Sequence, residues 1–221
     1  MTFARDAFIT GGTGYVGRAL CERLVGRGHR VRALVREGSQ GRLAPGCEAV
    51  PGNALDASTF ASQVRHTETF VQLVGVAHPG PAKAAEFRSV DLASARAGIE
   101  AARAANAAHF VYVSVAQPAP VMHAYVEARA EAEALLAASG LPATVLRPWY
   151  VLGPGHRWPL ALVPAYWLLE RLPGTREGAL RLGLVTLGQM VAALVSAVED
   201  GPPARTKILD VPAIREAALA R

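Results

Sequence analysis

Four glycines crowd into seven positions near the start of the chain, in the stretch TGGTGYVG from Thr10 to Gly17. Glycine in a strand or helix interior costs conformational order, so this density needs a physical reason. The stretch follows the apolar run AFIT and precedes a helical pattern in which Val16, Leu20 and Leu24 recur four residues apart. A glycine-rich turn between a strand and a helix presents backbone N–H groups at the positive end of the helix, where a diphosphate binds. We therefore predict a dinucleotide site at this turn.

Three of the four glycines of the turn have an expected role. Gly11 permits the tight turn, Gly14 lets backbone N–H groups approach the diphosphate, and Gly17 lets the helix pack closely on the sheet. The expected cofactor contacts in this stretch are Gly11, Thr13, Gly14, Tyr15, Val16 and Gly17.

Apolar runs alternate with helical patterns along most of the chain, which indicates a parallel sheet covered by helices on both faces. Ligands of such sheets bind at the carboxyl ends of the strands. We expect a doubly wound Rossmann fold of one domain, residues 1–221, in which 149–185 form a small C-terminal substrate cap. The predicted strands are 7–10, 30–35, 48–50, 69–75, 109–114, 143–147 and 207–211. The predicted helices are a first helix that contains Val16, Leu20 and Leu24 and closes at Gly26 and Gly28, followed by 56–64, 84–106, 122–139, 166–171 and 187–198.

The glycine spacing resembles the TGxxGxxG signature of the short-chain dehydrogenase/reductase superfamily, in its extended and atypical branches. The resemblance continues through GHRVRALVR, PGNALD, FVYVS, SGLPATVLRP and VLGPG, and it covers about residues 8–155. The remaining tail is similar to bacterial relatives of the dinucleotide-binding accessory subunit of respiratory complex I. The resemblance implies the same fold and an NAD(P) cofactor.

The resemblance also implies a catalytic constellation, Tyr-x-x-x-Lys on a helix with a serine at the end of the preceding strand. Tyr125 and Ser114 stand in the matching places, as acid–base group and carbonyl-orienting group, but Arg129 replaces the lysine. Arginine keeps the positive charge and can bond ribose hydroxyls, yet it does not release a proton at physiological pH. We expect cofactor binding to persist and a proton relay through Arg129 to fail. Glu133, one helical turn on, offers Arg129 an ion-pair partner, and Tyr125 is either catalytic or a buried, ligand-lining residue.

The residue at the end of the second predicted strand bears on the choice of nucleotide. An NAD site uses a carboxylate there, whereas this chain has Arg36, with Arg32 and Arg18 nearby. Guanidinium groups suit a 2′-phosphate, so we favour NADP, while Glu37 keeps NAD open. The resemblance places further cofactor contacts at Asn53, Ala54, Leu73, Val74, Gly75 and the backbone of Pro148.

The six histidines lack the spacing of metal ligands, so we predict no metal site. We expect His78, Tyr150 and His156 to face the substrate. Three aromatic residues, Trp158, Tyr166 and Trp167, are expected to pack the cap. The alternative for segment 158–172 is an amphipathic surface that contacts a membrane or a partner subunit.

Composition narrows the classes of partner. Eight arginines and three acidic residues lie within residues 1–42, and this surplus equals the net charge of +5. Such a basic segment suits a small polyanion, but no nucleic-acid motif accompanies it. No secretion signal or transmembrane segment is apparent, and two cysteines, Cys21 and Cys47, fit a reduced cytoplasmic protein.

The sequence thus favours an NADP-binding oxidoreductase that acts on a small carbonyl or related substrate. The alternative is a non-catalytic dinucleotide-binding sensor or complex subunit. A sugar-nucleotide epimerase or dehydratase ranks lower, because the cap is short. Neither the substrate nor the oligomeric state is indicated.

Overall fold

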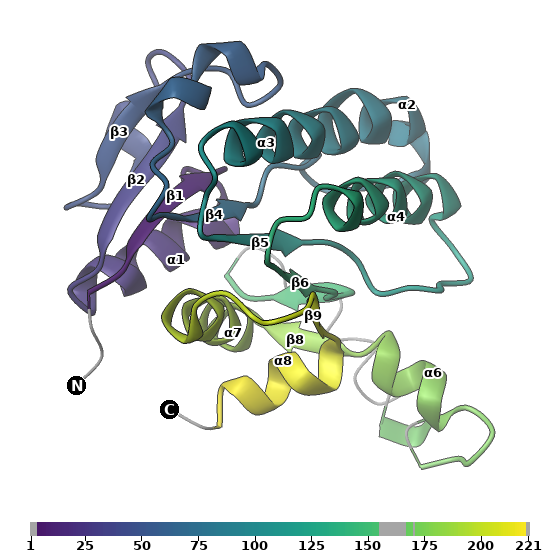
Figure 1. The fold of residues 1–221 in the computed structure, drawn as a ribbon. Helices are drawn as coiled ribbons and strands as arrows, with labels where there is room; N and C mark the ends of the chain where they lie inside the picture. The colour runs from purple at the N-terminus through teal and green to yellow at the C-terminus, as the bar shows by residue number, and fades with distance from the viewer. Residues whose placement is uncertain (1–3, 155–166, 170, 220–221) are drawn as a thin grey trace.

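A seven-stranded parallel sheet forms the centre of the protein (Figure 1). The computed structural model describes residues 4–154, 167–169 and 171–219. The strand order, β3-β2-β1-β4-β5-β6-β9, reverses between β1 and β4, so a crevice is expected at the carboxyl ends of these two strands. This topology confirms the predicted doubly wound fold. The strands are β1 (Asp6–Thr10), β2 (Arg30–Val35), β3 (Glu48–Pro51), β4 (Thr69–Gln72), β5 (His109–Val113), β6 (Ala143–Leu146) and β9 (Lys207–Leu209).

Helices cover both faces of the sheet (Figure 1). One face carries α3 and α4, and the other carries α1, α7 and α8. The predicted helix 84–106 is one continuous helical stretch that contains a π-helical segment, η5 (Phe87–Leu92). The α-helices are α1 (Tyr15–Gly26), α2 (Ala84–Glu86), α3 (Ala93–Ala104), α4 (His123–Ala138), α6 (Arg176–Arg181), α7 (Leu187–Asp200) and α8 (Val211–Ala217).

A ladder of phenylalanines fixes the register of three neighbouring strands. Phe8 pairs with Phe70, and Phe70 pairs with Phe110, in adjacent parallel strands. The ring centroids are 5.4 Å and 5.1 Å apart, and all three side chains are fully buried. Gly98 of α3 lies directly over Phe70, where a Cβ would come within 3.1 Å of the ring. Burying each ring contributes about 1.5–3 kcal/mol, so a shift of register would expose a large part of the core.

Two regions differ from the sequence-based expectations. Residues 56–64 form two short 3-10 turns, η2 (Ala57–Thr59) and η3 (Ala61–Gln63), instead of one helix, because Phe60 between them has an extended φ of −144°. A separate two-stranded parallel sheet was not predicted, because it joins distant segments: β7 (Tyr150–Leu152) and β8 (Leu184–Thr186). No helix among the described residues is long and apolar enough to cross a membrane.

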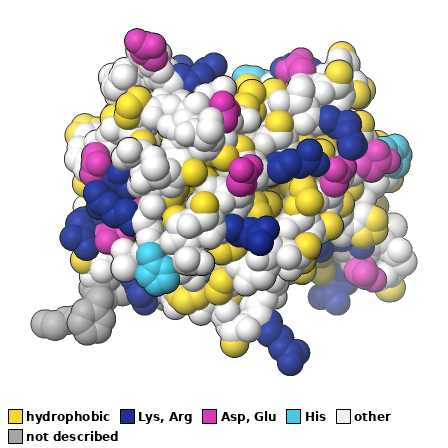
Figure 2. Space-filling model, turned by 45° about the horizontal axis from the view of Figure 1, so that its top comes forward, with side chains coloured by type: hydrophobic (Ala, Val, Ile, Leu, Met, Phe, Trp, Pro, Cys, Tyr) yellow, Lys and Arg dark blue, Asp and Glu magenta, His cyan; other side chains and the backbone are white. Residues whose placement is uncertain are grey.

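Four N-terminal arginines are engaged at the edge of the sheet where its strands begin, away from the glycine turn. Arg27 pairs with Glu199 at 2.6 Å, and Arg30 pairs with Asp6. Arg5 and Arg32 are held likewise, by the Glu199 carbonyl and by the carboxylates of Glu48 and Glu68. These four of the eight arginines in residues 1–42 therefore make contacts within the protein, away from the glycine turn, and do not serve a small polyanion there. On the face seen in Figure 2, charged side chains of both signs are interspersed.

His109, at the start of β5, couples stability to pH. Its side chain is fully buried, and Nε2 lies 2.9 Å from the Thr144 hydroxyl. Burial, together with the charges of Arg5 and Lys207, lowers the pKa of His109 to about 4 from 6.5. Between these values the unfolded chain takes up a proton that the folded protein refuses, so stability falls as pH falls.

We predict that the free energy of unfolding falls by about 3 kcal/mol more in the wild type than in His109→Asn between pH 7 and pH 4. Asparagine retains a group that can bond Thr144 but does not titrate in this range. Urea unfolding at a series of pH values measures the difference. Parallel pH profiles for the two proteins would show that His109 does not take part.

Candidate functional site

The backbone of the turn between β1 and α1 is in close contact with two other segments, the residues after β4 and the first turn of α1. Gly11 has a φ of +78°, and a Cβ there would lie 3.0 Å from the carbonyl carbon of Leu73. A Cβ on Gly17 would overlap the carbonyl oxygen of Gly11. Side chains are therefore excluded at both positions by the backbone itself. The expected role of Gly17, close packing of the helix, is met by its contact with the turn.

The backbone N–H groups that remain available to an anion include those of Val16 and Gly17, whereas that of Gly14 is used within the turn. The amide of Gly14 donates to Gly11 O at 3.0 Å and closes the turn. The amides of Val16 and Gly17 have no hydrogen-bond partner among the described residues. The first turn of α1 holds no acidic residue, so its positive end is not neutralised locally.

A cavity of about 360 Å³ lies beside this turn, at the carboxyl ends of β1, β2, β3 and β4. Its size is in the usual range for small-molecule pockets. Nine of the predicted cofactor contacts line it: Gly11, Thr13, Gly14, Arg36, Asn53, Ala54, Leu73, Val74 and Gly75. The structure therefore brings together residues from four segments, and their binding role stays a prediction. Gly52, which precedes Asn53 in the segment that the resemblance matches, also lines the cavity, and sequence reasoning missed five lining residues: Leu34, Val35, Ser39, Leu55 and Val90.

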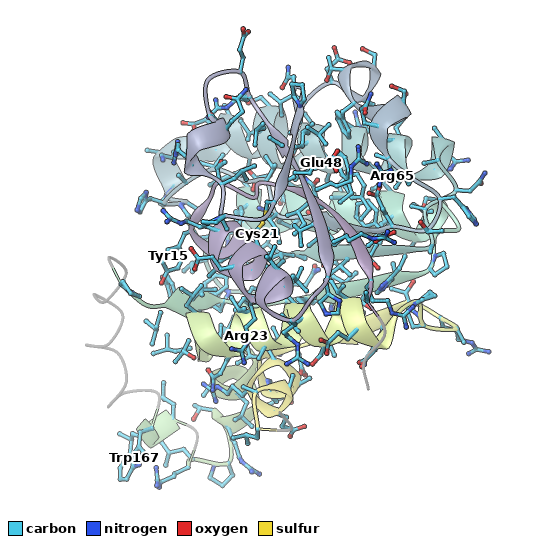
Figure 3. The ribbon with its side chains drawn as sticks, turned by 90° about the vertical axis from the view of Figure 1, so that its left-hand side faces the viewer. Tyr15, Cys21, Arg23, Glu48, Arg65 and Trp167 are labelled. Carbon is cyan, nitrogen blue, oxygen red and sulfur yellow. The ribbon has the colours of Figure 1, made fainter. Side chains whose placement is uncertain are left out.

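Four predicted cofactor residues lie outside the lining of this cavity. Tyr15 stands at the start of α1 (Figure 3), and its hydroxyl lies against Gly153. The carbonyl of Pro148 accepts a hydrogen bond from the Ala116 amide at 2.9 Å. The other two are Val16 and Gly17, in the first turn of α1.

Of the three arginines predicted near a 2′-phosphate, only Arg36 lines the cavity. Arg18 pairs with Glu22 on the surface of α1. Arg32 is buried against Glu68 at 3.1 Å. The turn after β2 is closed by the Ser39 amide, which donates to the Arg36 carbonyl at 3.0 Å, and both residues line the cavity.

Arg129 is buried, and both terminal nitrogens of its guanidinium donate to protein partners, whereas its Nε has no hydrogen-bond partner among the described residues. Its Nη2 donates to Asp91 Oδ1 at 2.5 Å and its Nη1 to Val113 O at 2.7 Å. The guanidinium also lies 5.3 Å from the ring centroid of Tyr125 and 5.7 Å from that of Tyr112. Burial opposes the charge, yet attraction by these two tyrosines and by Asp91 outweighs burial, so the pKa of this arginine lies above its usual value.

Tyr125 and Ser114 have different surroundings. The Tyr125 ring packs on Phe87 with centroids 4.9 Å apart, and its hydroxyl has no hydrogen-bond partner among the described residues. The Ser114 hydroxyl donates to Glu133 Oε1 at 2.5 Å. The expected pair of Glu133 with Arg129 is wrong: Glu133 instead accepts two hydrogen bonds from Arg147, because Arg129 is drawn to the more deeply buried Asp91.

The residues predicted to face the substrate are not brought into one described group. His78 is exposed after β4, and Tyr150 lies on β7 with its ring edge-on to Trp149. His156 lies outside the described residues, as do Trp158 and Tyr166. Trp167 is 57% exposed at the far end of the C-terminal part (Figure 3), so the expectation that it packs the cap is wrong. No cluster of metal-binding side chains occurs in the described ranges.

Known proteins resemble this chain in sequence and in fold. A family model described as NAD(P)H-binding matches residues 11–156. A 3-diazoavenalumate denitrifying reductase of Streptomyces is 32% identical over 87% of this chain and 71% of its own length. A ceramide reductase of Caulobacter vibrioides is 31% identical over 70% of this chain, which spans about half (49%) of that relative's length. The enzyme WbmH of Bordetella bronchiseptica, solved with NAD+, matches 94% of this chain and 76% of its own with a TM-score of 0.69 and 21% identity.

We predict that Gly17→Ala lowers the free energy of unfolding by at least about 2 kcal/mol, because its methyl group would displace the Gly11 carbonyl. Gly26→Ala, at the other end of α1, is the control, since a Cβ there meets no atom within 4 Å. Urea unfolding measures both. Equal stability of the two variants would mean that the turn relaxes freely and does not depend on this close approach.

Proposed function

Because this chain belongs to the NAD(P)H-binding family of short-chain dehydrogenase/reductase-like proteins, we propose that it is an NADP(H)-dependent oxidoreductase acting on a small carbonyl or related substrate. The observation that carries the proposal is the cavity at the carboxyl ends of β1–β4, bounded by the glycine turn and by Arg36. The names of the two reductases to which the chain is similar support the reaction class.

The residues at the cavity fit the parts of a dinucleotide. The glycines of the turn leave room for a diphosphate, and the amides of Val16 and Gly17, which have no partner among the described residues, can donate hydrogen bonds to it. Asn53 Oδ1 accepts the Leu55 amide, which leaves its NH₂ group to donate to an adenine ring. The bound nicotinamide would supply or take up the reducing equivalents.

The preference for NADP over NAD rests on Arg36 and Ser39. Arg36 is the one charged residue in the lining of the cavity, so a 2′-phosphate would meet a guanidinium and a hydroxyl with no nearby carboxylate in that lining. Glu37, which would favour NAD, is not among the lining residues. A charged acceptor paired with guanidinium forms stronger hydrogen bonds than a ribose hydroxyl does.

The proton donor to the carbonyl oxygen is the Tyr125 hydroxyl in this proposal. Its hydroxyl has no hydrogen-bond partner among the described residues, and the Arg129 guanidinium lies 5.3 Å from the centroid of its ring. Arg129 does not pass the proton on, because guanidinium remains charged. Ser114 donates to Glu133, so Tyr125 acts without a serine donor.

A second candidate function is a non-catalytic dinucleotide-binding module. The specific observation in its favour is that two groups expected to serve the substrate and ribose are both held by carboxylates: Ser114 donates to Glu133, and Arg129 donates to the buried Asp91. In that case the cavity binds a nucleotide as a sensor or structural ligand. A sugar-nucleotide epimerase or dehydratase stays the lower-ranked alternative.

We predict that Arg36→Gln weakens NADPH binding by about tenfold to a hundredfold and leaves NADH binding nearly unchanged, since one charge-assisted contact is worth about 1.5–3 kcal/mol. Nucleotide fluorescence or calorimetry gives the dissociation constants. Arg42→Gln is the control, because Arg42 does not line the cavity. Equal losses for NADPH and NADH would contradict a 2′-phosphate role for Arg36.

We also predict that Tyr125→Phe lowers kcat for NADPH-dependent reduction by at least about a hundredfold, the usual loss when a general acid is removed. Ser114→Ala should change kcat less than about threefold, because its hydroxyl is directed to Glu133. A panel of aldehydes, ketones and quinones provides the substrates. Full activity of Tyr125→Phe would rule out this proton donor, and tight NADPH binding without turnover of any substrate would favour the non-catalytic module.

A further inference from the structure

Asp91 joins three parts of the protein that surround the candidate site. It lies in the π-helical segment η5, and its side chain is fully buried. Oδ1 accepts from Arg129 on α4 at 2.5 Å, and Oδ2 accepts from the backbone amide of Val76, after β4, at 3.0 Å. Figure 1 shows the helical stretch containing η5 and α3 beside α4 on one face of the sheet. Both carboxylate oxygens are therefore used to hold neighbouring segments.

The Asp91–Arg129 pair forms the backing of one cavity wall. A Cβ on Gly75 would overlap Arg129 Nη2 and lie 2.9 Å from Asp91 Oδ1, so the pair rests directly on the backbone there. Gly75 lines the cavity, as does Val90, the residue before Asp91. A movement of the pair would move this wall.

The same ion pair also places a charged group against the ring of Tyr125. The charged and titratable described groups against Tyr125 are Arg129 on its own helix, whose guanidinium faces its ring, and, through that guanidinium, Asp91 on η5 and Tyr112 on β5. Asp91 is the one carboxylate that pairs with Arg129 among the described residues. A buried guanidinium without a counter-ion is strongly unfavourable, so Asp91 both retains Arg129 and offsets its charge.

We propose that Asp91 is a positioning residue of the dinucleotide site, which holds Arg129 against the ring of Tyr125 and holds the Val76 amide, and so fixes the cavity wall at residues 73–76. Asp91 acts through these groups and does not touch the ligand. The effect on nucleotide affinity rests on the proposed function, whereas the effect on Tyr125 does not.

Asp91→Asn tests the proposal, because it removes the charge with little change of size. Arg129 then loses its counter-ion and the Val76 amide loses a charged acceptor, so we expect the guanidinium to leave the ring of Tyr125 and the Val76 amide to exchange with solvent about tenfold faster. Amide-resolved hydrogen exchange measures the Val76 amide, and the chemical shifts of the Tyr125 ring protons report the guanidinium beside the ring. We also expect the dissociation constant for NADPH to rise about tenfold.

Two further variants separate positioning from general stability. The double variant Asp91→Asn/Arg129→Gln removes both members of the ion pair, and its dissociation constant for NADPH should be no higher than that of Asp91→Asn, because Asp91 acts through Arg129. Glu131→Gln is the matched control: Glu131 also ties α4 to η5 and α3, through Arg88 and Arg96, but on the exposed surface. It should alter neither the exchange of the Val76 amide nor the affinity for NADPH.

The outcomes are distinguishable. If Asp91→Asn lowers Tm but matches Glu131→Gln in exchange of the Val76 amide and in NADPH affinity, Asp91 is structural only and the proposal is wrong. If the wild type binds neither dinucleotide while Asp91→Asn still changes the Val76 exchange and the Tyr125 ring-proton shifts, the proposed function fails and the effect on Tyr125 stands. If Asp91→Asn does not fold, Asp91→Glu keeps the charge but lengthens the side chain: weaker NADPH binding supports the proposal, and unchanged binding overturns it.

Discussion

The carbonyl group of Gly11 occupies the most crowded point of the β1–α1 junction, and the candidate site depends on that crowding. It accepts the Gly14 amide on one side and meets the α-carbon of Gly17 on the other, while the Gly11 α-carbon lies against the backbone after β4. Three backbone segments can approach this closely only where side chains are missing. The result is a turn whose next amides are left without partners, beside a cavity at the strand ends. Such a turn binds anions without needing a charged side chain.

Charge in the rest of the site is neutralised locally. Arg129 is matched by Asp91, Arg32 by Glu68, and Arg147 by Glu133, so these three arginines serve to hold segments together. This arrangement leaves Arg36 as the cation lining the cavity and the Tyr125 hydroxyl without a hydrogen-bond partner among the described residues. The proposed chemistry is consequently simpler than the relay implied by the superfamily resemblance: one tyrosine beside one fixed positive charge. The same simplicity is what a binding module without catalysis would show.

The sequence predicted those features that depend on local patterns. Alternating apolar runs and helical periods predict the parallel sheet, and the spacing of four glycines predicts the turn, because each reflects a nearby backbone requirement. Partner choice among charged residues was not predictable in this way. Glu133 stands one helical turn from Arg129 yet pairs with Arg147. Arg129 pairs instead with Asp91, because the carboxylate of Asp91 is more deeply buried than that of Glu133. Asp91 itself carried one signal, a lone carboxylate on an otherwise apolar and small-residue helix face. The pairing of β7 with β8 joins segments that are distant in the sequence, so no local pattern predicts it. The exposure of Trp167 likewise depends on tertiary packing and not on the residues next to it.

The most direct measurement is an amide-resolved NMR titration of the protein with NADP+, followed residue by residue. If the backbone of the first β–α turn holds the diphosphate, the largest shifts should fall on Thr13, Val16 and Gly17, with smaller ones at Arg36 and at residues 73–76 across the cavity. Saturable shifts confined to another surface, such as the groove between α3 and α4 lined by Arg96 and Arg103, or no shifts at millimolar nucleotide, would contradict the account.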